Sequence, residues 1–426
     1  MFEKIVLKPL FLSKSKLSNY RYLTVVAFLL IIFSIFSYII GNKVSLDGDF
    51  NVFWQAGKNY LNGVSLYSQI GGAERFIYPP FAAMSFQFFA LFSLHQAAAI
   101  FCFFNFLFWI MIIYYTQHLL LFYKLNPKQI NYALLIAFIL SLRYFLYHIK
   151  FIQMNEIVLL MSLAGIYHFL HHKINTAIIL LVIATFIKII PLFILLLILS
   201  KCNYKKYFLT FFCVIICIVL PVLMRGKTQG FVDIHEYYIT FLAPFQHGRV
   251  EPKLQNYGLE AALYKLFSYT DNGNKYNYII TILSPETINL IYKIIIGFLL
   301  VAFAIIVFPF KTKKQIITLH EICFVLLFTH LLSGITWEYH LVTLFFVIAV
   351  LTMDYFNAPK KYRLLYYILG IILLFNSIIG TSTIGTYLYY KSCGFSLLTW
   401  LLLVLAIYSF GKYFYNRWLC SKKLQA

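Results

Sequence analysis

Long apolar runs separated by short polar or basic segments make up most of the chain. A helix needs about 20 apolar residues to cross a bilayer, and most runs approach that length. We therefore expect crossings near 22–40, 100–122, 129–146, 155–171, 174–187, 189–200, 207–224, 287–309, 316–334, 339–355, 364–386 and 395–415. The run at 81–94 is too short to span comfortably and is expected to dip into the membrane or lie at its surface. The pattern predicts one all-α polytopic bundle of about twelve transmembrane helices, residues 1–426, with no separate soluble domain.

Two long polar segments interrupt this pattern, at residues 42–96 and 225–285. In the first, residues 49–62 place aromatic side chains at helical spacing on one side and polar side chains on the other. That spacing predicts an amphipathic helix too polar to cross the membrane, with its aromatic side anchored in the outer leaflet. Asn62-Gly63 should end this helix.

Composition supports the membrane class and gives the orientation. The chain is 62% hydrophobic and 12% charged, which excludes a soluble globular domain. Its net charge of +21 falls in short clusters between apolar runs, as in cytoplasmic loops, so anionic lipids are expected partners rather than nucleic acid. Both chain ends should then be cytoplasmic, and the two long polar segments should face the extracytoplasmic side of the cytoplasmic membrane. The seven cysteines lack the spacing of a metal site or disulfide framework.

Carboxylates are scarce, with 14 in the whole chain, yet Asp47 and Asp49 occur two residues apart where the surface helix should begin. One interpretation is capping, since Asp is a favoured N-cap. The other is that Asp47 and Asp49 serve a function at this end of the molecule.

Basic side chains converge at the same end under this topology. The candidates are Arg143, Lys150, Lys188, Arg249 and His340. Together they could hold a phosphate group at the membrane surface, whereas each alone is typical of an interfacial residue. Lys188 differs because apolar sequence on both sides leaves it in need of a partner. The two short runs that meet at Lys188 predict a hairpin.

Several short motifs resemble those of glycosyltransferase family 87. The first polar segment carries Asp49-Phe50, Trp54-x-Ala56, Gly63 followed by Leu66-Tyr67, and Tyr78-Pro79-Pro80. Further along are Gln153-Met154-Asn155 with Ile152 in place of a glycine, Lys188 with Pro191, Gln255-Asn256 with Gly258-Leu259, and Ser333, Trp337 and His340 with Gly334 and Tyr339 in place of Pro and His. The similarity runs from about residue 47 to 345.

This resemblance implies a GT-C fold and transfer of a hexose, expected to be mannose, from a polyprenyl-phosphate donor to a hydroxyl of a glycolipid or glycan. It implies inversion at the anomeric carbon with a single Asp base, for which Asp49 is the first candidate and Asp47 the second. It implies neither a cofactor nor a metal. It places in the substrate site Tyr67, Tyr78, Gln153, Asn155, Gln255, Asn256 and Trp337. The departures at Ile152, Gly334 and Tyr339 leave the sugar open.

Two other functions compete with this interpretation. A transporter or flippase of lipid-linked saccharides should carry ionisable residues deep in several helices, whereas here polarity collects at one end. An inactive family member could instead serve as a partner subunit. A nucleotide-sugar donor is not expected, because no glycine-rich phosphate loop or pair of metal-binding acids stands out.

Overall fold

A computed structural model describes residues 16–46, 48–68, 76–243, 253–268, 276, 279–308 and 316–423, and these residues form helices and loops without strands. The first half contains α2 (Lys16–Gly41), α3 (Asp49–Asn62), α4 (Pro80–Phe86), η1 (Phe89–Leu91), α5 (Leu94–Phe122), α6 (Pro127–Phe151), α7 (Asn155–Leu170), α8 (Ile174–Ile187), α9 (Leu192–Leu199) and α10 (Tyr204–Arg225). The second contains α11 (Lys227–Tyr237), the π-helix η2 (Tyr238–Leu242), α13 (Leu259–Phe267), α14 (Pro285–Val307), α15 (Leu319–Leu332), η3 (Glu338–Thr343), α16 (Leu344–Asn357), η4 (Lys360–Tyr362), α17 (Arg363–Ile378), α18 (Thr381–Gly394) and α19 (Leu397–Lys423).

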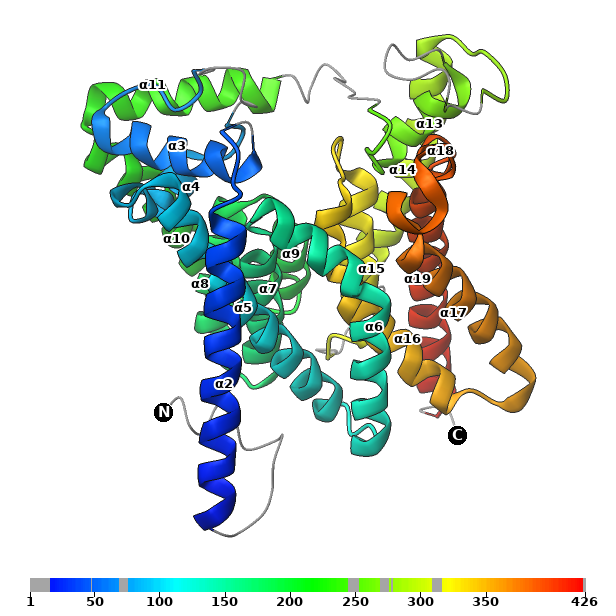
Figure 1. Cartoon of the computed structure of the whole chain (residues 1–426). Coiled ribbons are helices and arrows are strands. Elements are labelled where there is room, and N and C mark those ends of the chain that lie inside the picture. Colours follow the sequence, from blue (N-terminus) through cyan, green and yellow to red (C-terminus); the bar gives the residue numbers. More distant parts are fainter. Residues whose placement is uncertain are drawn as a thin grey trace.

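The long helices run between two ends of the molecule, and the short helices gather at one of them (Figure 1). At the upper end in Figure 1, α3, α4 and α11 lie on one side and α13 and α18 on the other. The core below is built from α6 packed on α16, α7 on α8, α15 on α19, and α5 between α2 and α7. Both long polar segments therefore contribute to the same end.

Helix length and composition identify the molecule as a polytopic membrane protein, as predicted. Among the described residues, seven helices are long and apolar enough to cross a membrane: Leu94–Phe122, Pro127–Phe151, Tyr204–Arg225, Pro285–Val307, Glu338–Asn357, Lys360–Ile378 and Leu397–Arg417. Four further apolar helices are shorter, Val26–Gly41, Asn155–Leu170, Ile174–Ile187 and Leu319–Leu332. The number of crossings, twelve, stays a prediction.

Local sequence signals set where several of these helices begin. Ser93 caps α5 in a reciprocal capping box with Gln96, and Thr318 does the same for α15 with Glu321. Each box satisfies backbone N–H groups that have no partner inside the helix. The segment before α5 forms only α4 and η1, of seven and three residues, so residues 81–94 contain no helix long enough to span.

One predicted crossing, residues 364–386, is wrong as a single helix. α17 ends at Ile378, and Ile379 and Gly380 are extended before α18 begins at Thr381. The run turns polar here, and the Gly380 backbone N–H donates to Thr383 Oγ1 at 2.9 Å instead of continuing the α17 ladder. A hydroxyl near a break offers the backbone an alternative to the helix, which apolar content alone did not reveal.

The surface helix was predicted with the correct bounds, but part of its aromatic side is buried. α3 begins at Asp49 and ends before Gly63, which adopts φ +69°. Its aromatic residues Phe50 and Phe53 are 1% and 2% exposed, and Phe53 stacks on Phe86 of α4. Phe50 and Phe53 therefore pack on the protein, whereas Trp54 is partly exposed and Leu61 is 45% exposed.

Candidate active site

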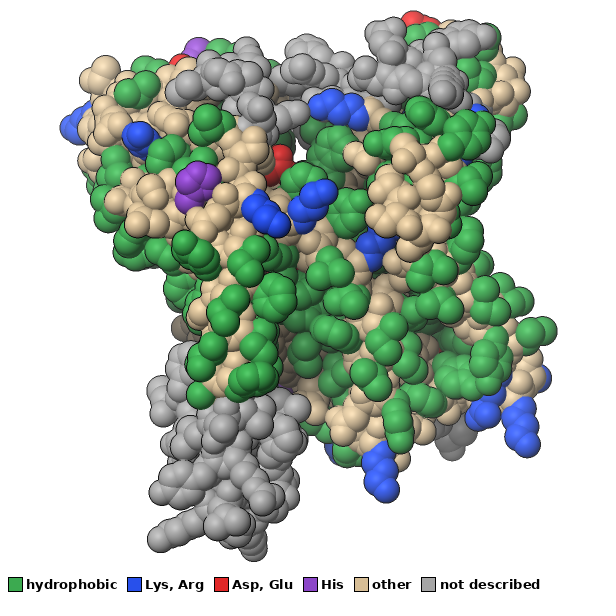
Figure 2. Space-filling model, in the orientation of Figure 1, with side chains coloured by type: hydrophobic (Ala, Val, Ile, Leu, Met, Phe, Trp, Pro, Cys, Tyr) green, Lys and Arg blue, Asp and Glu red, His purple; other side chains and the backbone are tan. Residues whose placement is uncertain are grey.

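A cavity of about 930 Å³ lies at the upper end of the bundle, between the α3 side and the α18 side. The space-filling view shows the hollow between these two sides, with an acidic side chain at its edge and Lys and Arg side chains below it (Figure 2). Its lining comes from α3, the loop before α4, the end of α6, the α8–α9 loop, η2, the residues around η3, and α18. Segments far apart in the sequence thus share one cavity.

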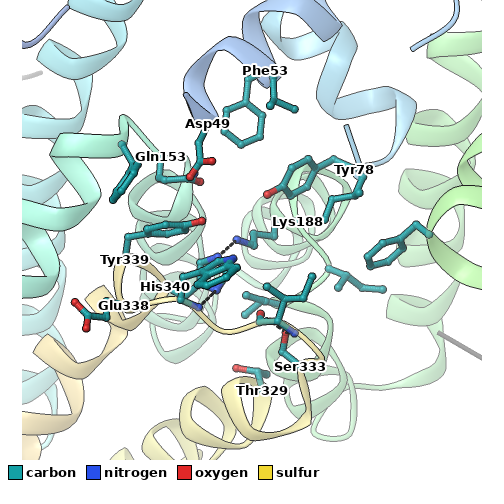
Figure 3. Close-up of a pocket in the computed structure, with 18 of the residues that line it drawn as sticks. Asp49, Phe53, Tyr78, Gln153, Lys188, Thr329, Ser333, Glu338, Tyr339 and His340 are labelled. Atoms are coloured by element: carbon teal, nitrogen blue, oxygen red, sulfur yellow. Dashed lines mark hydrogen bonds between the residues drawn. The ribbon is translucent and has the colours of Figure 1, made fainter. Parts of the chain in front are cut away.

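Asp49 enters this cavity from the first residue of α3 (Figure 3). The N-cap of α3 is Gly48, and no side chain makes a capping hydrogen bond there. Asp49 Oδ2 instead accepts a hydrogen bond of 2.6 Å from Gln153 Nε2. The positive end of the helix dipole favours a carboxylate at this position. Asp49 is therefore presented to the cavity and is not the N-cap.

Gln153 reaches Asp49 because the chain turns sharply after α6. Ile152 ends that helix with φ +47° and ψ +57°, a left-handed conformation rare for a β-branched residue. Asn105 Nδ2 donates to Gln153 O at 3.1 Å and holds the turn from α5. The family resemblance has a glycine at position 152, and glycine adopts this conformation without strain. The turn thus keeps its shape with Ile152 at some cost in backbone energy.

Lys188 lies in the loop between α8 and α9 and is 8% exposed. Its Nζ donates to Asn155 Oδ1 at 2.6 Å and lies 3.1 Å from His340 Nε2. Burial lowers the pKa of Lys188 to about 7, against an opposing effect of the Asp49 carboxylate. Lys188 can therefore change its charge near neutral pH.

The hydrogen bonds of His340 agree with a neutral amine at Lys188. The Trp337 backbone N–H donates to Nδ1 of His340 at 3.2 Å, so the neutral ring carries its proton on Nε2. Nε2 then donates to Lys188 Nζ, which accepts only as the uncharged amine. An anion placed beside Lys188 would favour the ammonium form.

Apolar side chains line the part of the cavity next to Lys188. Ile189, Ile190, Leu192 and Phe193 follow it in the α8–α9 loop and α9. Phe241 and Leu242 of η2 add further apolar lining to the same cavity. A polar pole beside apolar walls suits a ligand that has a charged head and a hydrocarbon chain.

A second polar group lies around Glu338. Its Oε1 accepts hydrogen bonds from Arg143 Nη2 at 2.5 Å, from Tyr257 at 2.9 Å and from Tyr389 at 3.0 Å. Arg143 also donates to the backbone oxygen of Asn376, which ties α6 to α17. Glu338 and Tyr389 line the cavity, whereas Arg143 and Tyr257 stand behind them.

The structure distributes the predicted site residues between the cavity and its support. Seven predicted residues besides Asp49 line the cavity: Tyr78, Lys150, Gln153, Lys188, Gln255, Trp337 and His340. Four stand behind it: Tyr67, Arg143, Asn155 and Asn256. Asp47 and Arg249 lie outside the described residues.

The supporting residues hold the lining in place. Tyr67 donates to the Tyr78 backbone oxygen at 2.8 Å, and Asn155 orients Lys188. Asn256 donates to the Gly334 backbone oxygen at 2.8 Å and joins the loop of Gln255 to the loop before η3. Gly258 permits this approach, because a Cβ there would lie 2.6 Å from Ser333 O.

Sequence reasoning placed Glu338 at the same end as the other polar residues but gave it no role, and it missed Tyr147 and Tyr389 as cavity residues. The scarcity of acids could have drawn attention to Glu338, which lies between Trp337 and His340. No comparable signal marks Tyr147 or Tyr389 in a chain with 34 tyrosines. Among the described residues no group of three or more His, Cys, Asp or Glu could hold a metal ion. The absence of a cofactor stays a prediction.

Comparison with known protein families identifies the family of the chain that forms this cavity. The sequence profile of glycosyltransferase family 87 matches residues 76–334, more than half of the chain. The chain belongs to glycosyltransferase family 87. No curated protein gives a significant match.

Family membership makes this protein a membrane glycosyltransferase, so a transporter is no longer the favoured alternative. The matched range contains Gln153, Lys188 and Gln255. Asp49 precedes the matched range and His340 follows it. Asp49 is hydrogen-bonded to Gln153, and His340 is hydrogen-bonded to Lys188, so both residues contact the matched range.

Proposed function

We propose that this family 87 protein transfers a hexose, with mannose as the expected sugar, from a polyprenyl-phosphate donor to a hydroxyl of a glycolipid or glycan. The observation that carries the proposal is one cavity with Asp49, Lys188 and an adjoining apolar wall. Asp49 supplies a base, Lys188 a cation for the phosphate, and the Ile189–Phe193 segment a surface for the carrier chain.

In the proposed reaction, the acceptor hydroxyl oxygen attacks the anomeric carbon and gives its proton to the Asp49 carboxylate. The bond from that carbon to the phosphate oxygen breaks, and its electron pair leaves with polyprenyl phosphate. Lys188, as the ammonium, stabilises the negative charge that grows on this leaving group. Attack opposite the leaving group inverts the anomeric centre, so a β-linked donor gives an α-linked product.

Gln153 positions the base in this scheme. Its amide donates to Asp49 Oδ2 at 2.6 Å, and Oδ1 is the oxygen proposed to receive the proton. The charge balance also favours a lipid phosphate over a nucleotide, because the cavity offers few cations and the described residues hold no candidate metal site. A nucleoside diphosphate would need more positive charge to offset its own.

The proposed sidedness rests on charge. The α5–α6 and α16–α17 turns lie at the end of the bundle opposite the cavity (Figure 1), and they carry Lys124, Lys128, Lys360, Lys361 and Arg363. Such clusters favour the cytoplasmic side. The cavity would then open on the extracytoplasmic side of the cytoplasmic membrane.

Replacing Asp49 with Asn tests the proposed base. The change keeps the shape and the hydrogen bond from Gln153 possible but removes the basic oxygen. We expect the turnover number to fall about a hundredfold or more, with melting temperature retained.

Asp47→Asn is the matched variant and should keep most activity. Loss in Asp47→Asn alone would make Asp47 the base, and full activity in both would refute the mechanism. A wild type that is inactive with every donor, yet folded, would favour the role of partner subunit.

A further inference from the structure

The carboxylate of Glu338 is only half used by the protein. Oε1 accepts three hydrogen bonds, from Arg143, Tyr257 and Tyr389. Oε2 is buried and has no hydrogen-bond partner among the described residues. The residue is 4% exposed and lines the cavity. A buried carboxylate oxygen without a partner is costly, so a ligand that supplies a donor would restore a lost interaction.

The neighbours of Glu338 define the kind of donor. Arg143 Nη2 donates to Glu338 Oε1 at 2.5 Å, and a carboxylate paired with a guanidinium offers its oxygens as hydrogen-bond acceptors. A negative oxygen repels phosphate, and the guanidinium of Arg143 is already engaged by Glu338 and Asn376. This side of the cavity therefore suits a neutral ligand rich in hydroxyl groups.

The surrounding wall has the form of a sugar-binding surface. It is built from Tyr147 of α6, Gln255, and Thr381, Tyr389 and Tyr390 of α18. Tyr147 and Tyr390 are partly exposed, and a tyrosine offers an apolar ring face for the C–H groups of a sugar and a hydroxyl at its edge. Tyr389 is 1% exposed and contributes its hydroxyl, which bonds Glu338 and Gln255. Gln255 Nε2 donates to Tyr389 Oη at 3.1 Å, which fixes the amide and the ring together. The rings and the amide are thus held in place before a ligand arrives.

The Glu338 wall is separate from the phosphate side. Figure 3 shows the Glu338 carboxylate apart from the Lys188–His340 pair, with Tyr339 between Glu338 and Asp49. All of these residues line the same cavity of about 930 Å³. Ligand cavities range over about 300–1,000 Å³, so this one has room at the upper end of that range for two substrates.

We infer that the Glu338 wall is the acceptor-sugar subsite, where Glu338 Oε2 accepts a hydrogen bond from a hydroxyl of the acceptor. The inference rests on the proposed function, since an acceptor is needed only if the cavity transfers a sugar. A glycan held at this wall would extend toward Asp49, which would then meet a different hydroxyl of the same acceptor.

Binding measurements on the full chain in lipid nanodiscs separate the two sides. The probes are a panel of short-chain alkyl hexosides for the acceptor side and polyprenyl phosphate for the donor side, both titrated by calorimetry. We expect Glu338→Gln to weaken the best-binding hexoside about tenfold or more, because an amide N–H replaces the accepting oxygen, and to leave polyprenyl phosphate within about twofold. Lys188→Ala should do the reverse.

Gly297→Ala in α14 is the matched control. Nothing lies within 4 Å of the Cβ that this change would add, so both affinities should stay unchanged. Gln255→Leu tests the same wall without disturbing Arg143, and it should weaken hexoside binding even if Glu338→Gln fails to fold.

Unchanged hexoside affinity in both Glu338→Gln and Gln255→Leu would overturn the subsite, as would a wild type that binds no hexoside. Hexoside binding that needs Glu338, in a protein that does not bind polyprenyl phosphate, would refute the proposed donor and leave the sugar subsite standing.

Discussion

Asp49 and Lys188 lie 139 positions apart in a chain whose hydropathy says nothing of their proximity. Their importance was predictable from sequence, because a carboxylate before a helix and a lysine between two apolar runs both cost free energy in a membrane protein. The residues that bond to them could not be predicted from sequence. Gln153, Asn155 and His340 reach them through turns whose geometry, such as the positive φ of Ile152, hydropathy does not encode.

The pKa of Lys188 predicts how donor affinity depends on pH. Its ordinary value of 10.5 is lowered to about 7 by burial, with Asp49 opposing, while His340, His330 and Tyr78 also face the amine or its surroundings. Below pH 7 the ammonium is present before the phosphate binds. Above pH 7 binding must first take up a proton, so the donor KM should rise with pH by up to about tenfold per unit.

Lys188→Arg supplies the control for this pH profile, because a guanidinium stays charged throughout the range. Its donor KM should be flat from pH 6 to 9, and Lys188→Ala should raise the donor KM at every pH. A wild-type profile that matches that of Lys188→Arg would contradict the role of Lys188.

At the scale of elements, α3 shows what hydropathy can and cannot predict. The bounds followed from helical spacing and from Asn62-Gly63, and they are confirmed. The packing of Phe50 and Phe53 against the protein was not predictable, since a pattern of aromatic residues looks the same whether it faces lipid or another helix. The break at Ile379–Gly380 was missed because apolar content does not show where a hydroxyl, here that of Thr383, replaces a backbone hydrogen bond of the helix.

The contact between α3 and α4 depends on Gly57. A Cβ at this position would lie 2.5 Å from Phe86 O, closer than such atoms approach. Gly57→Ala should therefore push α3 away from α4, lower the melting temperature, and reduce turnover by displacing Asp49.

Gly297 of α14 is the matched control, because nothing lies within 4 Å of the Cβ that Gly297→Ala would add. That variant should keep or slightly raise the melting temperature, since alanine favours helix over glycine. Equal melting temperatures and turnover for the two variants would show that the close α3–α4 contact does not hold the site.

At the scale of the whole molecule, the alternation of basic clusters and polar segments predicted that residues 42–96 and 225–285 share one end. The described parts of both segments do lie there, at the end with the cavity. Lys and Arg side chains appear at the opposite end in Figure 2. Hydropathy predicts which segments share an end of the bundle because the bilayer sorts apolar from polar segments. It does not predict the shape of the cavity, which depends on side chains from at least six segments.

Cysteine labelling tests the proposed orientation. Asn62→Cys at the end of α3 should react in intact cells with a thiol reagent that does not cross the membrane, because Asn62 is exposed at the cavity end. Lys360→Cys, exposed at the opposite end, should react only after the cells are opened. Each variant is compared with the parent chain to correct for its seven native cysteines. The reverse pattern would place the cavity on the cytoplasmic side.

Transfer of labelled sugar by the purified protein in proteoliposomes is the most direct test of the proposed reaction, in which a hexose passes from a polyprenyl-phosphate donor to an acceptor hydroxyl. The protein would be given polyprenyl-phosphate hexoses or nucleotide hexoses, each with a lipid extract that contains acceptors. We expect label to appear in a new glycolipid or glycan when the donor is a polyprenyl-phosphate hexose, with mannose as the best sugar, and no transfer from nucleotide sugars. Transfer from a nucleotide sugar would contradict the proposed function. So would a folded protein that transfers sugar from none of the donors tested.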